Sequence, residues 1–242
     1  KRTLNFFILH FSGYFCDLDI NVLSLHRIKN RFSLTRMNSQ SPDNIHWSEN
    51  VIIADGDYID SVAFNLIVNF ERMLDRRIPP ADLSRWTMDI ALDGGLREGK
   101  HETQLVLLHD KGKQSLDNFA PKAYDSELNG KAFRDDRLGE FIVNAIATGG
   151  EANDKESVLL DILGIILNHK EVKRIMVIPD SENSDIWRTL VSTFNRLDDD
   201  DKHITLFAMQ PMEGGNFRQQ ILGYSLMNAM GITQKEIDEK MK

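Results

Sequence analysis

The chain has 242 residues, of which 41% are hydrophobic and 27% charged, and its formal net charge is −8. These values are ordinary for a globular protein and exclude a fibrous or largely disordered chain. The negative charge disfavours nonspecific coating of nucleic acid, because binding to the phosphate backbone depends on cations that displace counterions. No apolar run reaches the roughly 18 residues that a membrane span requires, so we expect no membrane partner.

Residues 1–36 differ from the rest, since they are basic, rich in aromatic residues and without clear helix or strand signals. Met37 follows them directly, so we interpret 1–36 as a leader outside the natural domain and 37–242 as a single α/β domain. The alternative is that the leader is an added strand or tail. Cys16, the only cysteine, lies in the leader, and no small-residue cleavage site follows its apolar stretch. Both features favour the reducing cytoplasm over secretion.

The first predicted unit is a strand followed by a helix. Residues 51–54 form a continuous apolar run, as in a buried strand. The pattern then predicts a helix over residues 61–76 with Asp60 as its N-cap. Its expected core stripe has helical spacing and comprises Val62, Ala63, Leu66, Ile67, Phe70, Met73 and Leu74.

The middle third has weaker patterns. Apolar and polar residues alternate over 86–92, which predicts a strand, and 104–108 predicts another. Gly94, Gly95 and Gly99 lie between them and favour a hairpin turn. Residues 111–137 are polar and irregular, and 141–147 predict a further strand.

The last third again alternates helices and strands. Asn153 and Asp154 are expected to cap a helix that ends near residue 168. Strands over 174–178 and 203–209 and helices over 186–197 and 217–230 follow, and Thr233 and Glu236 have capping-box spacing for a terminal helix. Because strands joined by helices favour parallel pairing, the sequence predicts a three-layer, Rossmann-like α/β fold with a mixed, mostly parallel sheet.

Acidic residues follow two of the predicted strands. Asp55 and Asp57 come after residues 51–54, and Asp180 and Asp185 come after residues 174–178. Parallel strands would bring these acids to one edge of the sheet, where ligands bind in α/β proteins. Asp161 lies on the narrow polar stripe of an otherwise apolar helix and faces either this edge or water.

Carboxylates that converge in this way bind Mg²⁺ or Mn²⁺. We therefore predict Asp55, Asp161 and Asp180 as metal ligands, with Asp55, Asp57, Asp180 and Asp185 as the catalytic set. Such a metal would activate water and offset the charge of a phosphodiester. The alternative interpretation is structural, because Asp and Gly are common after strands and Asp60, Asp154 and Asp185 suit helix N-caps.

The chain resembles the NYN/PIN-like nucleases. The matching parts are residues 51–57, Asp161, and residues 174–185 with the helix and strand that follow them. The resemblance implies metal-dependent cleavage of RNA at a local site. The chain departs from that pattern after its first Asp and in the longer turn after residue 178. The domain also resembles an uncharacterised bacterial family of unknown function.

A second resemblance is to the haloacid-dehalogenase-like phosphatases, in which the first Asp of Asp55-Gly56-Asp57 would be a nucleophile and Asp180 with Asp185 a metal pair. The chain lacks room for the usual flap and lacks a Ser or Thr after residues 107–109. A noncatalytic interaction or regulatory module is the remaining hypothesis. Five apolar residues are expected to be either core or the seam of a homodimer, namely Phe217, Leu222, Leu226, Met227 and Met230.

Overall fold

The computed structural model describes residues 46–149, 154–195, 202–215 and 217–241. They fall into two compact units, one made of Trp47–Leu159 and Lys170–Lys242, and the other containing Leu160–His169. The predicted leader, 1–36, and residues 37–45 lie outside the described part of the chain. The fold described below belongs to the larger unit.

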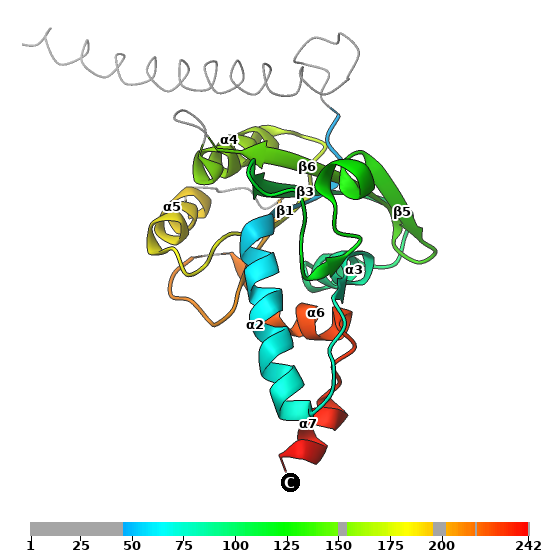
Figure 1. Cartoon of the computed structure of the whole chain (residues 1–242). Helices are drawn as coiled ribbons and strands as arrows, with labels where there is room; N and C mark the ends of the chain where they lie inside the picture. The colour runs from blue at the N-terminus through cyan, green and yellow to red at the C-terminus, as the bar shows by residue number, and fades with distance from the viewer. Residues whose placement is uncertain (1–45, 150–153, 196–201, 216, 242) are drawn as a thin grey trace, which may run out of the picture. The chain divides into compact units, whose positions relative to one another are not determined.

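A seven-stranded sheet with the order β5-β6-β3-β1-β7-β8-β9 forms the centre of this unit (Figure 1). Its strands are β1 (Asn50–Asp55), β3 (His101–Asp110), β5 (Lys131–Asp135), β6 (Gly139–Thr148), β7 (Arg174–Ile178), β8 (His203–Ala208) and β9 (Arg218–Ile221). All neighbours pair in parallel except β5, which is antiparallel to β6. If the six parallel strands β1, β3, β6, β7, β8 and β9 are renumbered 1 to 6 along the chain, their order across the sheet is 3-2-1-4-5-6, which is the doubly wound order.

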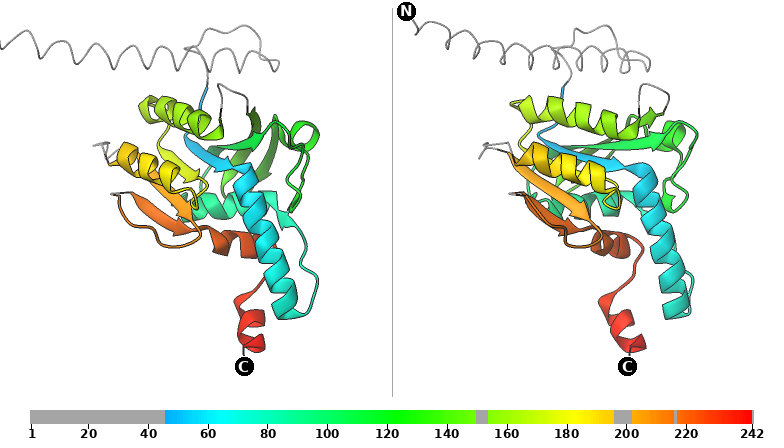
Figure 2. Two further views of the ribbon diagram at one scale, coloured as in Figure 1. Left: turned by 60° about the vertical axis from the view of Figure 1, so that its left-hand side comes forward. Right: turned by 90° about the vertical axis from the view of Figure 1, so that its left-hand side faces the viewer.

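Both faces of the sheet are covered, which makes the fold a three-layer α/β arrangement. Every residue of β1 is buried, and its side chains alternate between the two faces. Ile52 and Ala54 join a core cluster with residues of α2 (Gly56–Leu74), α3 (Leu83–Asp93) and α6 (Leu222–Ala229). The views in Figure 2 show α3 and α6 on one side of the sheet and α5 (Ser184–Phe194) on the other. The predicted Rossmann-like fold with a mixed, mostly parallel sheet is confirmed.

The first helix starts earlier than predicted. α2 begins at Gly56, directly after β1, and its N-cap is Asp55. Asp60 is therefore not the N-cap. It is instead a buried residue whose carboxylate accepts a hydrogen bond from the backbone N–H of Asn118 at 2.8 Å, which fixes the loop after β3. The prediction failed because Asp55 follows the strand without any intervening turn.

Residues 86–92 form part of helix α3 and not a strand, so the predicted hairpin is wrong. Asp82 caps α3 by accepting a hydrogen bond from the N–H of Arg85. The buried residues Leu83, Trp86 and Ile90 have helical spacing that the alternating pattern concealed. The mixed character of the sheet comes from β5, whose antiparallel pairing with β6 lies in the stretch expected to be irregular. That stretch also contains β4 (Phe119–Ala120), paired with β2 (Ala81–Asp82), and a π-helical turn, η2 (Tyr124–Leu128).

The last third follows the prediction with two corrections. α4 (Lys155–Asn168), β7, α5 and β8 occur where expected, but Asn183, not Asp185, is the N-cap of α5. The predicted helix over 217–230 is split into the edge strand β9 and the shorter α6. α7 (Gln234–Lys240) has the predicted Thr233–Glu236 capping box. Leu222, Leu226 and Met230 are buried in the core, which confirms the core interpretation for these residues.

Among the helices that the structure describes, none is long and apolar enough to cross a membrane.

Candidate functional site

The two acid-tipped strands are neighbours. β1 pairs in parallel with β7, and Ala54 lies opposite Ile178, so Asp55 and Asp180 leave the sheet at the same edge. In the order 3-2-1-4-5-6, this pair is where the strand order reverses, and ligands of open α/β sheets bind outside that point. The predicted common edge for Asp55 and Asp180 is thus present.

Asp55 and Asp57 are fixed by the start of α2. Asp55 is 8% exposed, and its Oδ1 accepts a hydrogen bond from the N–H of Tyr58 at 3.0 Å. Asp57 lies in the first turn, and its Oδ2 accepts a hydrogen bond from the N–H of Asp110, the last residue of β3, at 2.9 Å. The positive end of the helix dipole favours both negative charges here.

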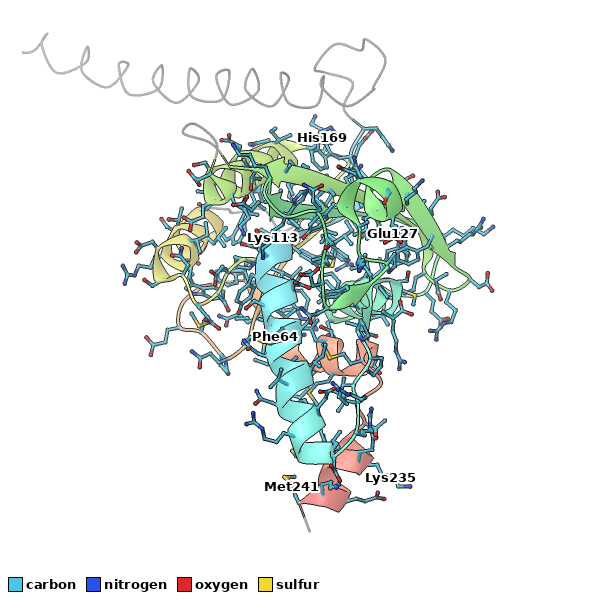
Figure 3. All side chains as sticks on the ribbon, viewed as in Figure 1. Phe64, Lys113, Glu127, His169, Lys235 and Met241 are labelled. Carbon is cyan, nitrogen blue, oxygen red and sulfur yellow. The ribbon has the colours of Figure 1, made fainter. Side chains whose placement is uncertain are left out.

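Lys155, the first residue of α4, bridges these two carboxylates. Its Nζ lies 2.6 Å from Asp55 Oδ1 and 2.7 Å from Asp57 Oδ2. A second lysine, Lys113, lies 3.4 Å from Asp57 Oδ1, beside the start of α2 as Figure 3 shows. One buried and one half-buried acid are therefore compensated by two ammonium groups, of which Lys155 is the less exposed, at 26% against 50%.

The environment moves the pKa values of the two acids in opposite directions. Burial raises the pKa of Asp55, and this outweighs the charge of Lys155, which lowers it. Burial also acts to raise the pKa of Asp57, but hydrogen bonds from Lys155 and from the Asp110 N–H outweigh it and lower that pKa. Neighbouring carboxyl groups with divergent pKa values are typical of sites that perform acid and base chemistry.

The loop after β7 is held close to this pair. Tyr58 Oη and Ser181 Oγ are 2.7 Å apart, which ties α2 to the residue after Asp180. Burial raises the pKa of Tyr58, and the charges of Glu182, Asp180 and Asp55 add to the rise. Asp180 itself accepts a hydrogen bond from the Glu182 N–H at 3.0 Å. Asp180 therefore lies within electrostatic reach of the Asp55 cluster.

Asp185 is exposed, in contrast to the buried Asp55. Its side chain is 85% exposed and lies 3.4 Å from Arg188 Nη1, within the first turn of α5. Its charge nevertheless acts on Glu156, whose pKa is raised by burial and by the charges of Asp154, Asp180, Asp185 and Asp55. Glu156 is a further acidic residue of this edge that the sequence did not single out.

Asp161 lies on α4 within Leu160–His169, the segment that belongs to the other compact unit. It is half-buried, while Ser157, Gly164 and Asn168 of its polar stripe are exposed. Among the residues that the structure describes, no group of three or more His, Cys, Asp or Glu side chains is arranged to hold a metal ion. The metal set of Asp55, Asp161 and Asp180 stays a prediction.

One wall of the site is aromatic. The rings of His109 and Tyr124 are stacked, with centroids 3.7 Å apart and planes 7° from parallel. Tyr124 Oη approaches the start of α2 so closely that a Cβ on Gly56 would lie 2.8 Å from it, so this position requires glycine. Burial and the charges of Asp57, Asp60 and Asp55 raise the pKa of Tyr124, which keeps its hydroxyl neutral.

Lys155 is the most important residue that the sequence interpretation missed. One signal was available, because a lysine at the first position of a helix faces the positive end of the helix dipole and needs a compensating anion. Asp110, Tyr58 and Ser181 gave no comparable signal, since their contacts join elements that are distant in the sequence.

Fold and site together define a doubly wound α/β protein with a compensated cluster of acids and lysines at the carboxyl edge of its sheet. The chain belongs to the family described as "Family of unknown function (DUF6621)", whose model matches residues 44–237. This confirms the expected membership in a family of unknown function. A search of curated proteins and a search of solved structures each found no match.

Proposed function

We propose that this domain is a Mg²⁺- or Mn²⁺-dependent phosphodiesterase of the NYN/PIN-like nuclease type that acts on RNA in the cytoplasm. The observation that carries the proposal is the adjacency of β1 and β7, which brings Asp55, Asp57 and Asp180 to the reversal point of the sheet. Substrates of α/β enzymes bind at this point.

The donor atoms are of the type that a hard divalent cation prefers. Lys155 Nζ lies within 2.7 Å of two carboxylates, so the cluster already stabilises one positive charge between Asp55 and Asp57. Carboxylate oxygens are the ligands that Mg²⁺ and Mn²⁺ prefer. A bound ion would supply an activated water and neutralise charge on the scissile phosphate. Asp180 is the additional carboxylate of this edge, and Asp161, in the other compact unit, stays a predicted ligand.

The chain's own residues have distinct tasks in this proposal. Asp57, with its lowered pKa, stays ionised and holds positive charge. Asp55, buried at the end of β1, is the second proposed ligand beside it. Lys155 and Lys113 provide cations that can pair with a phosphate when they leave the carboxylates. The Tyr58–Ser181 contact keeps the Asp180 loop in position.

Cleavage of a labelled single-stranded RNA with MnCl₂ tests this proposal. We expect metal-dependent cleavage by the parent protein and a loss of at least about 100-fold in Asp55→Asn, because that variant loses the charge of a metal ligand. Glu239→Gln removes one negative charge from α7, where Glu239 faces Lys235, and is the matched control. The proposal fails if the parent shows no cleavage that exceeds the Asp55→Asn background.

The second candidate is a noncatalytic interaction or regulatory module. It is favoured by Lys155, which closes on Asp55 and Asp57 at distances typical of strong, fixed ion pairs. In that function the acids are structural, and the partner is another protein or a second copy that forms a homodimer. Absence of both Mn²⁺ binding and RNA cleavage, with a dimer mass in light scattering, would support this candidate over the nuclease.

A further inference from the structure

Three arginines gather at the amino edge of the sheet, away from the acidic site. Arg174 is the first residue of β7, Arg218 is the first residue of β9, and Arg97 follows α3. A strand rises about 3.3 Å per residue, so Arg174 and Ile178 lie about 13 Å apart along β7. The arginine cluster (Arg97, Arg174 and Arg218) is therefore separate from the Asp55 site.

A glycine turn allows two of these guanidinium groups to approach each other. Gly95 has a φ of +91°, and a Cβ at this residue would lie 3.0 Å from Arg218 Nη1 and 3.1 Å from Arg174 Nη1. Arg174 Nη1 also donates a hydrogen bond to the carbonyl oxygen of Gly94 at 2.9 Å. The backbone thus fixes Arg174, and Arg218 lies over the same turn.

The positive charge of the cluster is only partly compensated. Arg174 Nε is buried, and no hydrogen-bond acceptor for it is found within the described part of the chain. Burial and the charges of Arg97 and Arg218 lower the pKa of Arg174, and Glu49 opposes this. A guanidinium keeps its proton in proteins, so the repulsion persists at neutral pH.

Several carboxylates lie near these cations. Glu49 also pairs with Lys173, at 3.5 Å. Burial and the charge of Asp89 raise the pKa of Asp93, and the charge of Arg218 acts against this rise. The cations Arg97, Lys173, Arg174 and Arg218 thus lie near the carboxylates of Glu49, Asp93 and Asp89. In a chain of net charge −8, a group of three arginines at one edge of the sheet is a specific feature.

We propose that the arginine cluster binds a phosphate dianion, either as the free ion or as the terminal monoester of a nucleotide or RNA end. The planar fork of a guanidinium matches the oxygens of a phosphate, and several arginines can share one group. Arg97 and Arg218 are exposed and can reach a ligand in solution, while Arg174 supplies a fixed charge beneath them. A dianion offsets the mutual repulsion of three guanidiniums better than the single charge of a phosphodiester.

Isothermal titration with inorganic phosphate at constant ionic strength tests this site. We expect saturable binding to the parent protein and at least about tenfold weaker binding to Arg218→Gln and to Arg97→Gln, since each loses a charge-assisted hydrogen bond. Both side chains are exposed, so these variants should keep the fold. Arg77→Gln removes an arginine whose side chain is 95% exposed at the end of α2 and is the matched control. Equal phosphate affinity in the parent and the Arg218→Gln variant, or no binding to the parent, overturns the proposal.

Two further titrations identify the source of the phosphate. The first compares a 5′-mononucleotide with its nucleoside, and the second compares an oligoribonucleotide with and without a 5′-phosphate. Tighter binding of either phosphorylated ligand than of inorganic phosphate identifies a monoester as the ligand, and weaker binding identifies the free ion. Equal affinity with and without the phosphate contradicts a phosphate site. Asp55→Asn should bind phosphate as the parent does, so this result is independent of the nuclease proposal.

Discussion

The two edges of the central sheet carry charge in opposite ways. At the carboxyl edge, the buried Asp55 and the half-buried Asp57 are compensated, because Lys155 contacts both within 2.7 Å. At the amino edge, Arg174 has a buried donor without a protein acceptor among the described residues, and Arg97 and Arg218 repel it. The acids of the first edge are thus paired within the protein, whereas the second edge keeps a buried guanidinium donor unpaired among the described residues.

Lys155→Met removes the ammonium group that pairs with both Asp55 and Asp57. It leaves two carboxylates at a largely buried position without their shared cation, and we expect a loss of about 3 kcal/mol in the free energy of unfolding. Urea unfolding measures this loss. Lys113→Met, which removes the half-exposed lysine near Asp57, should cost no more than about 1 kcal/mol. Equal losses in the two variants would contradict the assigned role of Lys155.

Gly95→Ala tests the amino edge. A Cβ at φ +91° is strained, and it would meet both Arg174 and Arg218, so we expect a loss of about 1–2 kcal/mol. Thermal unfolding monitored by circular dichroism measures it. Gly164→Ala in α4 is the control, because a Cβ there has no neighbour within 4 Å and helix propensity predicts a gain of up to about 1 kcal/mol. A neutral Gly95→Ala would show that the arginines do not depend on this turn.

The pH dependence of stability separates the two acids of the carboxyl edge. The pKa of Asp57 is lowered in the folded protein, so its stabilisation is present above the unfolded value near 3.8 and is lost as the pH falls through the lowered pKa. The pKa of Asp55 is raised, so its contribution has the opposite sign and is lost as the pH rises through the raised pKa. Melting temperatures between pH 2.5 and 6 should therefore fall less steeply on acidification in Asp57→Asn than in the parent. In Asp55→Asn they should fall more steeply, and identical profiles would contradict the opposite shifts.

Tyr124→Phe should have the smallest effect. Tyr124 Oη is buried and has no hydrogen-bond partner among the described residues, so its removal leaves no other group unsatisfied. We expect a change within about 0.5 kcal/mol of zero in urea unfolding, because the stacked ring against His109 is retained. A loss near that of Lys155→Met would mean that the hydroxyl contributes to the carboxyl edge.

The sequence was sufficient for the fold class because the buried strands are continuous apolar runs, as in residues 51–54 and 174–178. It failed for α3, because residues 86–92 satisfy both a strand pattern and a helix pattern. The tertiary packing of Trp86 and Ile90 decides in favour of the helix. It also failed for β9, a short polar edge strand whose pairing with β8 depends on the rest of the sheet.

The candidate site was predictable in part. The common edge of Asp55, Asp57 and Asp180 was predictable because parallel neighbouring strands end at the same edge of a sheet. Lys155 and the arginine cluster were not found, since their contacts join positions separated by many residues and depend on which elements pack together. A lysine at a helix start was the only local trace of the first cluster.

A titration with MnCl₂, followed by thermal melting, tests most directly whether the carboxyl edge holds a cation between Asp55 and Asp57. We expect Mn²⁺ to raise the melting temperature of the parent, because an ion that binds only the folded state stabilises it. The shift should be larger in Lys155→Met, in which the competing ammonium is gone, and absent in Asp55→Asn. A Lys155→Met protein whose melting temperature does not respond to Mn²⁺ would contradict the account.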